Sequence, residues 1–277
     1  MRATAAALRD AAARLAGVSD TPRLDAELLL AHALGITREA LLTSPPLSRL
    51  RADGGRESFD ELVARRLAHE PVAYITGRRA FWTIELAVTG DVLIPRPDSE
   101  TLIEAAVARF GGDGPARVLD LGTGSGALLL AALDQWPAAT GLGIDVSPAA
   151  LAVARANGAR IAPERAEFRR GDWTDGIGEA FDLVLCNPPY IATAARLPRD
   201  VAAWEPAGAL YAGADGLAAY RALAPRIGGV LRPTGVACVE IGAGQATSAR
   251  ALFEHAGLKV AERRDLGGHV RCLTMRH

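Results

Sequence analysis

The tetrapeptide Asn187-Pro188-Pro189-Tyr190 has residue types that could hold a planar amino group for reaction. Its two prolines fix the backbone and remove N–H donors, which leaves acceptors: the Asn187 side-chain oxygen and the Pro188 carbonyl. Two convergent acceptors would orient both hydrogens of an NH2 group and favour the more positive nitrogen of a transition state. Tyr190 could stack on the flat group that carries this nitrogen. The alternative is a proline-stiffened loop without chemistry, because Asn and Pro are common in turns.

A second candidate site is the run Gly122-Thr123-Gly124-Ser125-Gly126, which follows an apolar segment that we expect to be a strand. Glycines allow a tight turn and a close approach of ligand to backbone, and the helix expected next has free N–H groups at its start. The run also matches the dinucleotide pattern G-x-G-x-x-G/A, with Asp145 near the position of the ribose-binding acid. A nicotinamide-dependent enzyme and a glycine turn that serves packing alone both stay open at this point.

Two acidic residues near this run suit a ligand that contains a ribose and a positive charge. Asp145 ends the second expected strand and could accept hydrogen bonds from ribose hydroxyls. The other interpretation of Asp145 is a helix N-cap, which Ser147 before Pro148 would fill better. Asp120 precedes the glycines and has little use in a dinucleotide site, but it could attract the amino group or the sulfonium of a methionine-derived cofactor.

Asp172 and Trp173 follow the third expected strand. Asp172 could accept a hydrogen bond from an adenine amino group, and Trp173 could stack on the ring unless it only packs between layers. Nothing in Asn187–Tyr190 serves hydride transfer. The tetrapeptide therefore favours methyl transfer to an amide or amine nitrogen over a dinucleotide-dependent reaction. Beyond the effect of the two acceptors, we expect most of the rate enhancement to come from in-line positioning of the reacting groups.

Strands that alternate with helices are expected to position these residues. This alternation predicts a parallel, doubly wound sheet whose last two strands form an antiparallel edge. The expected strands are Arg117–Leu121, Gly141–Asp145, Ala166–Arg169, Phe181–Cys186, Gly235–Ile241 and a terminal pair around Lys259–Asp265 and Val270–Thr274.

The part of the chain before the alternating region has a different pattern. Apolar residues at three-and-four spacing predict helices up to about residue 70, with Pro22 in a first turn after Thr21. Short β-like runs, which include Tyr74 and Ile75, then predict a hairpin-like connector. A further helix is expected from about 98 to 110.

Composition argues against several classes of protein. The net charge is −1, and the chain after residue 80 has 19 basic and 22 acidic residues, so no positive excess indicates a nucleic-acid binder. The cysteines are isolated, which fits a reducing cytoplasm, and no His/Cys cluster has zinc spacing. There is no signal-peptide core and no run of about 18 apolar residues that would span a membrane. We therefore expect a cytoplasmic protein without a metal or a membrane anchor.

The motifs together resemble a class of methyltransferases that act on amino groups. Asn187–Tyr190 after such an α/β pattern is similar both to adenine-N6 methyltransferases of DNA and RNA and to release-factor glutamine methyltransferases. The resemblance to the second group, the peptide chain release factor N5-glutamine methyltransferase (PrmC/HemK) family, extends over essentially the whole chain and is weakest over residues 1–65. It is carried by the segments Glu70–Gly77, Phe81-Trp82, Leu93–Glu100, Asp172-Trp173 and Trp204-Glu205-Pro206.

The resemblance implies an α/β fold with a seven-stranded, Rossmann-like class I methyltransferase sheet, preceded by a small all-helical N-terminal domain and a β-hairpin connector. The implied domains are residues 1–72 for substrate recognition, residues 73–97 as the hairpin linker, and residues 98–277 as the S-adenosylmethionine-dependent methyltransferase domain. The C-terminal segment Asp265–His277 departs from the family pattern, which affects the edge hairpin and none of the proposed catalytic residues.

The implied reaction is methylation of the side-chain amide nitrogen (N5) of the glutamine in the Gly-Gly-Gln motif of class I peptide chain release factors. The methyl donor would be S-adenosyl-L-methionine, the product S-adenosyl-L-homocysteine, and no metal would take part. The implied partners are the release factors, with no stable nucleic-acid binding and no membrane. An adenine-N6 methyltransferase acting on nucleic acid is the alternative, and a non-catalytic binding protein is a third hypothesis.

From the residues and the resemblance together, we expect three overlapping sets of site residues. Asn187, Pro188 and Tyr190 would be catalytic. The substrate would be held by these residues with Pro189, Arg96 and Glu100, although Arg96 and Glu100 could instead be an ordinary surface pair. The cofactor would be bound by Asp120, Gly122, Thr123, Gly124, Ser125, Gly126, Asp145, Asp172, Trp173 and Asn187.

Overall fold

The computed structural model describes residues 2–43 and 57–277. Within these residues the backbone divides into two compact units. The smaller unit contains the residues up to Arg78 together with 197–204, and the larger unit contains residues 79–196 and 205–277.

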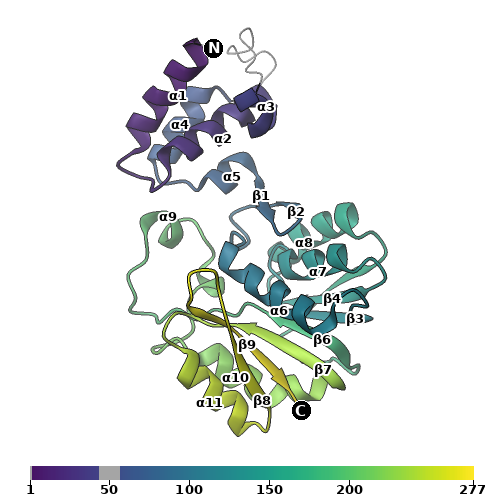
Figure 1. The fold of residues 1–277 in the computed structure, drawn as a ribbon. Coiled ribbons are helices and arrows are strands. Elements are labelled where there is room, and N and C mark those ends of the chain that lie inside the picture. The colour runs from purple at the N-terminus through teal and green to yellow at the C-terminus, as the bar shows by residue number, and fades with distance from the viewer. Residues whose placement is uncertain (1, 44–56) are drawn as a thin grey trace. The chain divides into compact units, whose positions relative to one another are not determined.

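The smaller unit is built from helices (Figure 1). Pro22 occupies the first turn of its second helix after Thr21 at the N-cap, as the sequence predicts. Ser58 and Glu61 form a capping box at the start of α4. Leucines from α1, α2 and α4 fill a common core. The helices are α1 (Arg2–Leu15), α2 (Pro22–Leu34), α3 (Arg38–Thr43), α4 (Phe59–Leu67), α5 (Val72–Thr76) and α9 (Arg199–Ala202).

One local prediction about this region was wrong. Tyr74 and Ile75 were expected in a β-like run, but they lie in the short helix α5. Pro71 stands at its N-cap and Gly77 ends it in a left-handed conformation with φ 71°. Ile75 is buried in the helical core, so its packing and the two end signals outweigh a weak strand propensity. The hairpin consists of β1 (Arg78–Phe81) and β2 (Ile84–Ala87).

A buried ion-pair cluster holds the short helix α9 within the smaller unit. Arg66 Nε donates to Asp25 Oδ2 at 2.9 Å, and Arg66 Nη2 lies 3.6 Å from Asp200 Oδ2. The Arg66 side chain is 7% exposed. The segment 197–204 is therefore anchored to the helices, although in sequence it falls between strand β6 and helix α10 of the larger unit.

The larger unit contains a seven-stranded sheet with the order β5-β4-β3-β6-β7-β9-β8. The first five strands in this order run parallel, and β9 pairs antiparallel with both β7 and β8. The predicted doubly wound sheet with an antiparallel edge is therefore confirmed. The strands are β3 (Arg117–Leu121), β4 (Thr140–Asp145), β5 (Ala166–Arg170), β6 (Phe181–Cys186), β7 (Leu231–Glu240), β8 (Lys259–Arg264) and β9 (Val270–Arg276).

The strand register brings the predicted motifs to one edge of the sheet. Leu121 at the end of β3 is paired with Ile144 of β4 and with Cys186 of β6. The residues that follow these three strands therefore leave the sheet side by side. They are the glycine run after β3, Asp145 at the end of β4 and Asn187 after β6.

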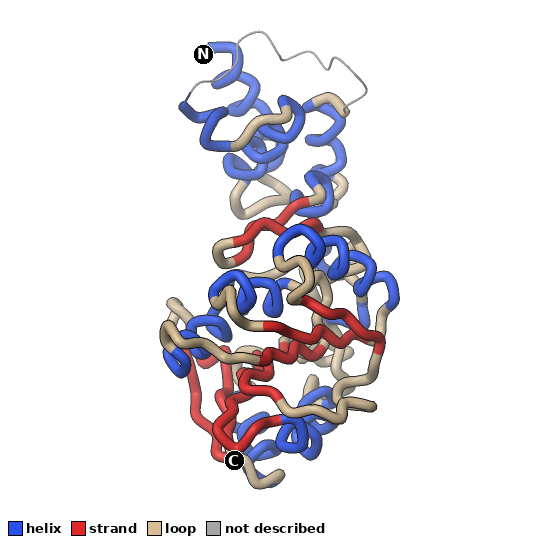
Figure 2. The backbone as a smooth tube through the Cα atoms, turned by 90° about the vertical axis from the view of Figure 1, so that its right-hand side faces the viewer, coloured by secondary structure: helices blue, strands red, loops and turns tan. Residues whose placement is uncertain are grey.

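Helices cover both faces of this sheet (Figures 1 and 2). One face carries α6 (Glu100–Phe110), α7 (Ala127–Gln135) and α8 (Pro148–Ile161), and the other carries α10 (Ala218–Ile227) and α11 (Ala246–His255). Short 3-10 turns occur at Pro97–Ser99, Ala207–Ala209 and Gly228–Val230. Among the helices of residues 2–43 and 57–277, none is long and apolar enough to cross a membrane.

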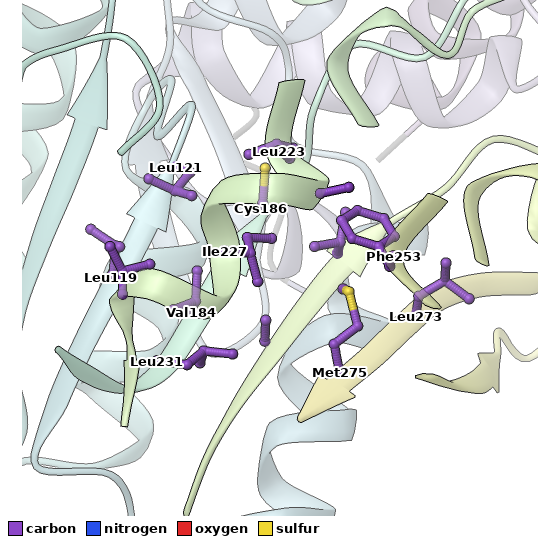
Figure 3. Packing of buried hydrophobic residues seen from close by; sticks show 14 of the residues in the cluster. Leu119, Leu121, Val184, Cys186, Leu223, Ile227, Leu231, Phe253, Leu273 and Met275 are labelled. Carbon is purple, nitrogen blue, oxygen red and sulfur yellow. The ribbon is translucent and has the colours of Figure 1, made fainter. Parts of the chain in front are cut away.

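The core between the sheet and α10 and α11 is apolar and fully buried (Figure 3). Leu119 and Val184 come from neighbouring central strands, Ile227 from α10, Phe253 from α11 and Met275 from β9. Each such side chain contributes about 1.5–3 kcal/mol by leaving water. This packing gives the edge of the sheet that bears the motifs a rigid support.

Candidate active site

A cavity of about 430 Å³ lies within the larger unit, where β3, β4 and β6 end. Its walls include the residues Gly122 to Ser125, Asp145, Trp173 and Asn187. Open α/β sheets bind their ligands at the carboxyl ends of the strands. The structure thus brings most of the predicted cofactor residues to the position that the fold favours for a ligand.

Backbone hydrogen bonds hold the glycine run in place. The N–H groups of Gly122 and Thr123 both donate to the Ile144 carbonyl at 2.9 Å. Gly122 and Gly124 have φ of 70° and 54°, a region in which side chains are strained. A Cβ atom on Gly122 would lie 3.8 Å from the Trp173 ring. The run is therefore held in a fixed conformation, and the position of Gly122 without a side chain leaves its backbone open toward the Trp173 ring.

Asp145 connects two backbone segments around the cavity. Its Oδ2 accepts from Gly124 N and its Oδ1 accepts from Ser147 N, both at 2.9 Å. Each carboxylate oxygen has further lone pairs, so both can also accept from a diol. Ser147 itself caps α8 by accepting from Ala150 N, which is the role that the sequence assigned to Ser147 in preference to Asp145.

Asp120 is a buried carboxyl at the floor of the cavity. Its Oδ2 accepts from Thr123 Oγ1 at 2.6 Å and from Leu129 N at 3.3 Å. Its Oδ1 is buried and has no hydrogen-bond partner among the described residues. Burial raises the pKa of Asp120 to about 7, although the bonds from Thr123 and Leu129 favour the charged form. A buried acceptor of this kind suits a ligand that brings positive charge or N–H donors.

Asp172 and Trp173 form another wall of the cavity. Trp173 has φ of 51°, which is uncommon for a residue other than glycine and costs roughly 1 kcal/mol or more. The Trp173 ring packs partly against the apolar core, and Asp172 is exposed to solvent. This arrangement gives a half-buried ring beside an exposed acceptor.

Asn187 lies in the cavity wall with its amide nitrogen already in use. Asn187 Nδ2 donates to Ser99 Oγ at 3.0 Å. The Asn187 oxygen receives no hydrogen bond from any residue that the structure describes. Pro189 and the buried Ser99 line the cavity beside Asn187. The site therefore presents an acceptor where a planar NH2 group would need one.

Tyr190 is held from two sides and does not line the cavity. Its hydroxyl donates to Glu240 Oε1 at 3.1 Å, and its carbonyl accepts from Gln245 Nε2 at 2.9 Å. Burial and the Glu240 charge raise the pKa of Tyr190 well above its ordinary value. Pro188 is buried and also lies outside the cavity wall. Stacking of Tyr190 on a substrate stays a prediction.

Arg96 and Glu100 have separate partners. Arg96 forms an ion pair with Glu205, whose side chain is 1% exposed and whose Oε2 also accepts from Ile94 N at 3.2 Å. Glu100 Oε1 accepts from Trp82 N at 2.8 Å, and Trp82 has φ of 53°. Neither Arg96 nor Glu100 lines the cavity. Their role in holding a substrate stays a prediction.

Sequence reasoning did not single out Ser99 within the segment 94–100, which the family resemblance implied would line the site, and it missed Glu240 altogether. Glu240 is 1% exposed at the end of β7, and burial raises its pKa to about 7. The signal that could have identified Glu240 is a single acid in the otherwise apolar run from 236 to 241, since buried carboxyls are rare without a purpose.

Comparisons with known proteins bear on the family and the fold of the chain. A family model of the PrmC N-terminal domain matches residues 6–77, and one of a methyltransferase domain matches residues 113–259. The methyltransferase from Pyrococcus furiosus aligns with a TM-score of 0.54 at 18% identity, over 76% of this chain and 95% of that one, which supports the fold alone.

Two curated relatives carry the same description. The release factor glutamine methyltransferase of Rhodospirillum rubrum is 45% identical over 267 residues, which are 95% of this chain and 81% of the relative. That of Cereibacter sphaeroides is 45% identical over 284 residues, which cover 100% of this chain and 99% of the relative. With 45% identity over at least 95% of this chain and at least 81% of each relative, the chain belongs to the release factor glutamine methyltransferase family.

Proposed function

We propose that this protein transfers a methyl group from S-adenosylmethionine to the side-chain amide nitrogen of the glutamine in the Gly-Gly-Gln motif of class I peptide chain release factors. The observation that carries the proposal is the position of Asn187 in the cavity wall, with its nitrogen bonded to Ser99 and its oxygen left to accept. The names of the relatives support the substrate.

The residues around the cavity fit S-adenosylmethionine. The cavity of about 430 Å³ is within the usual range for small-molecule sites. The buried, unpartnered Asp120 Oδ1 suits the positively charged end of the cofactor. Asp145 would accept from the ribose hydroxyls, and Trp173 with Asp172 would hold the adenine. When bound, the cofactor supplies a methyl group on a positively charged sulfur.

The tetrapeptide would orient the glutamine amide. Asn187 Oδ1 and the Pro188 carbonyl would each accept one hydrogen of the substrate NH2 group. An amide nitrogen is a weak nucleophile because its lone pair is delocalised, and acceptors at both hydrogens stabilise the more positive nitrogen as it reacts. The nitrogen loses a proton after methyl transfer, so a charged base need not touch it at the start.

The helical domain predicted over residues 1–72 would help to grip the release factor. The match of residues 6–77 to the PrmC N-terminal domain supports this role. A protein that modifies release factors would work in the cytoplasm, where translation ends.

The experiment uses purified protein, labelled S-adenosylmethionine and a class I release factor. Controls are the same factor with its Gly-Gly-Gln glutamine replaced by alanine, and bulk DNA and RNA. We expect label on the unaltered factor alone. Label on nucleic acid alone would contradict the proposal and support adenine-N6 methylation, and absence of label on every acceptor would contradict catalysis.

A further inference from the structure

Gln245 is a half-buried residue at the N-cap of α11, and its side chain reaches back to the end of the tetrapeptide. Its Nε2 donates to the Tyr190 carbonyl at 2.9 Å and to the Gly216 carbonyl at 3.3 Å. Its Oε1 accepts from Gly242 N and from the Tyr220 hydroxyl, both at 3.1 Å. One carboxamide therefore connects the tetrapeptide to α10, to the loop before α10 and to the turn after β7.

The partners of Gln245 decide which way its carboxamide faces. A carboxamide has two N–H hydrogens and an oxygen with two lone pairs, and all four are used here. A backbone N–H such as that of Gly242 can only donate, and the carbonyls of Tyr190 and Gly216 can only accept. Turning the carboxamide over would set donor against donor and acceptor against acceptor at these groups. The NH2 group of Gln245 is therefore locked on the Tyr190 carbonyl.

Two glycines leave the space that this arrangement needs. A Cβ atom on Gly216 would lie 2.4 Å from the Tyr190 carbonyl oxygen and 2.8 Å from Gln245 Nε2. A Cβ atom on Gly242 would lie 2.6 Å from Gln245 Oε1 and 3.0 Å from Tyr190 Cδ2. Gly242 does not have a positive φ, so it is space, and not backbone conformation, that requires a glycine there. The contact between Gln245 and Tyr190 is thus closely packed as well as hydrogen-bonded.

The peptide group that follows Tyr190 is held on both sides. A trans peptide points its C=O and its N–H in opposite directions. The C=O of this group accepts from Gln245, and its N–H, which belongs to Ile191, donates to the Leu210 carbonyl at 2.9 Å. Gln245 therefore supplies one side of a clamp on the last peptide group of the tetrapeptide.

The prolines make the rest of the tetrapeptide depend on contacts at its ends. Pro188 and Pro189 have no N–H group, so backbone donors cannot hold the middle of the segment. Their rings also restrict rotation of the backbone between Asn187 and Tyr190. A displacement of the Tyr190 carbonyl would therefore be passed back along a stiff segment to the Pro188 carbonyl.

We propose that Gln245 is a positioning residue for methyl transfer, which holds the Tyr190 carbonyl and thereby keeps the Pro188 carbonyl aimed at the substrate amide. The inference rests on the proposed function, in which the Pro188 carbonyl is one of two acceptors for the amide hydrogens. A misplacement of about 1 Å at a reacting centre can lower the rate about 100-fold. Gln245 does not line the cavity, so the cofactor should bind without its help.

The test compares Gln245→Glu with the wild type. The substitution keeps the shape and the acceptor oxygen of the side chain but sets an oxygen against the carbonyls of Tyr190 and Gly216. We expect kcat to fall about 10- to 100-fold, while KM for S-adenosylmethionine and for the release factor each stay within about threefold of wild type. The kcat is expressed per site that binds S-adenosyl-L-homocysteine at saturation, so that misfolded protein is not counted.

Two further variants separate positioning from folding and from charge. Gln135→Glu makes the same chemical change at another half-buried glutamine, whose Oε1 accepts from Trp82 Nε1 at 3.2 Å, and it should keep the wild-type kcat. Gly242→Ala leaves Gln245 in place in the sequence but adds a Cβ atom against its Oε1. We expect Gly242→Ala to lower kcat per binding site in the same way as Gln245→Glu, with the same unchanged KM values.

The outcomes that would overturn the inference differ from those that concern the proposed function. A Gln245→Glu protein with wild-type kcat per binding site would overturn the inference, and so would an equal fall in Gln135→Glu. A loss that appears only in the KM for S-adenosylmethionine would overturn it as well, since Gln245 would then serve the cofactor. A wild type that binds S-adenosyl-L-homocysteine but methylates no release factor would overturn the proposed function instead.

Discussion

Asn187 donates its amide hydrogen to Ser99 Oγ over 3.0 Å, so its oxygen is the atom that remains for a substrate. We predict that Asn187→Ala lowers kcat about 100- to 1,000-fold, the usual effect of removing one well-placed polar group at a reacting centre. Cofactor affinity should fall far less, since Asp145 and the glycine run are unchanged. Single-turnover methyl transfer and calorimetric cofactor binding measure the two effects. Equal losses in both would show that Asn187 serves cofactor binding alone.

The buried Asp120 should make stability depend on pH. Its pKa is raised to about 7 from an ordinary value of 3.8, mainly by burial. The folded protein therefore holds this proton where the unfolded chain has lost it, and the free energy of unfolding should fall as pH rises from about 4 to 7.

Without cofactor, the free energy of unfolding should fall less between pH 5 and pH 8 in Asp120→Asn than in the wild type. The expected difference between the two proteins is on the order of 1–3 kcal/mol. Urea unfolding at both pH values measures the difference. Glu240 contributes a slope of the same sign in both proteins, so the comparison isolates Asp120. Identical slopes would mean that Asp120 stays charged in the folded protein throughout.

Gly143 in β4 has no room for a side chain. A Cβ atom there would lie 2.7 Å from Phe168 Cδ1 and 2.9 Å from Thr123 Oγ1. We expect Gly143→Ala to lower the free energy of unfolding by about 1–3 kcal/mol and to weaken cofactor binding by displacing Thr123. Gly178→Ala is the control, because no atom lies within 4 Å of its added Cβ. If Gly143→Ala and Gly178→Ala had the same free energy of unfolding, the expected steric conflict at Gly143 would be contradicted.

The Arg96–Glu205 pair offers a test by double substitution. Glu205 is 1% exposed on its side chain and Arg96 is 32% exposed. Arg96→Ala would leave a buried carboxylate without its cation, at a cost of about 2 kcal/mol after allowance for solvent at the Arg96 end. Adding Glu205→Gln should restore part of this stability. Denaturant unfolding of the four proteins measures the coupling, and strictly additive losses would argue against a direct interaction.

The patterns that sequence reasoning used were local, and that explains what it found. Strand ends, glycine runs and the prolines after Asn187 impose their structure within a few residues, so the sheet and the motif residues in the cavity wall were predictable. Ser99 and Glu240 lie far from Asn187 in sequence and acquire meaning only when β7 and the turn before α6 meet the end of β6. Tyr74 and Ile75 were misassigned because the burial of Ile75 in a helical core outweighed the local strand propensity.

The two outermost strands of the seven-stranded sheet affect how readily the protein could aggregate at high protein concentration. β5 and β8 each leave one row of backbone groups without a neighbouring strand in the sheet order. Such rows can recruit strands from other molecules and start aggregation. Here they carry exposed charges, Glu167, Arg169 and Arg170 on β5 and Lys259, Arg263 and Arg264 on β8. A strand from another molecule that paired with either edge would have to desolvate these charges, which costs free energy. The charged edges therefore oppose the growth of intermolecular sheets.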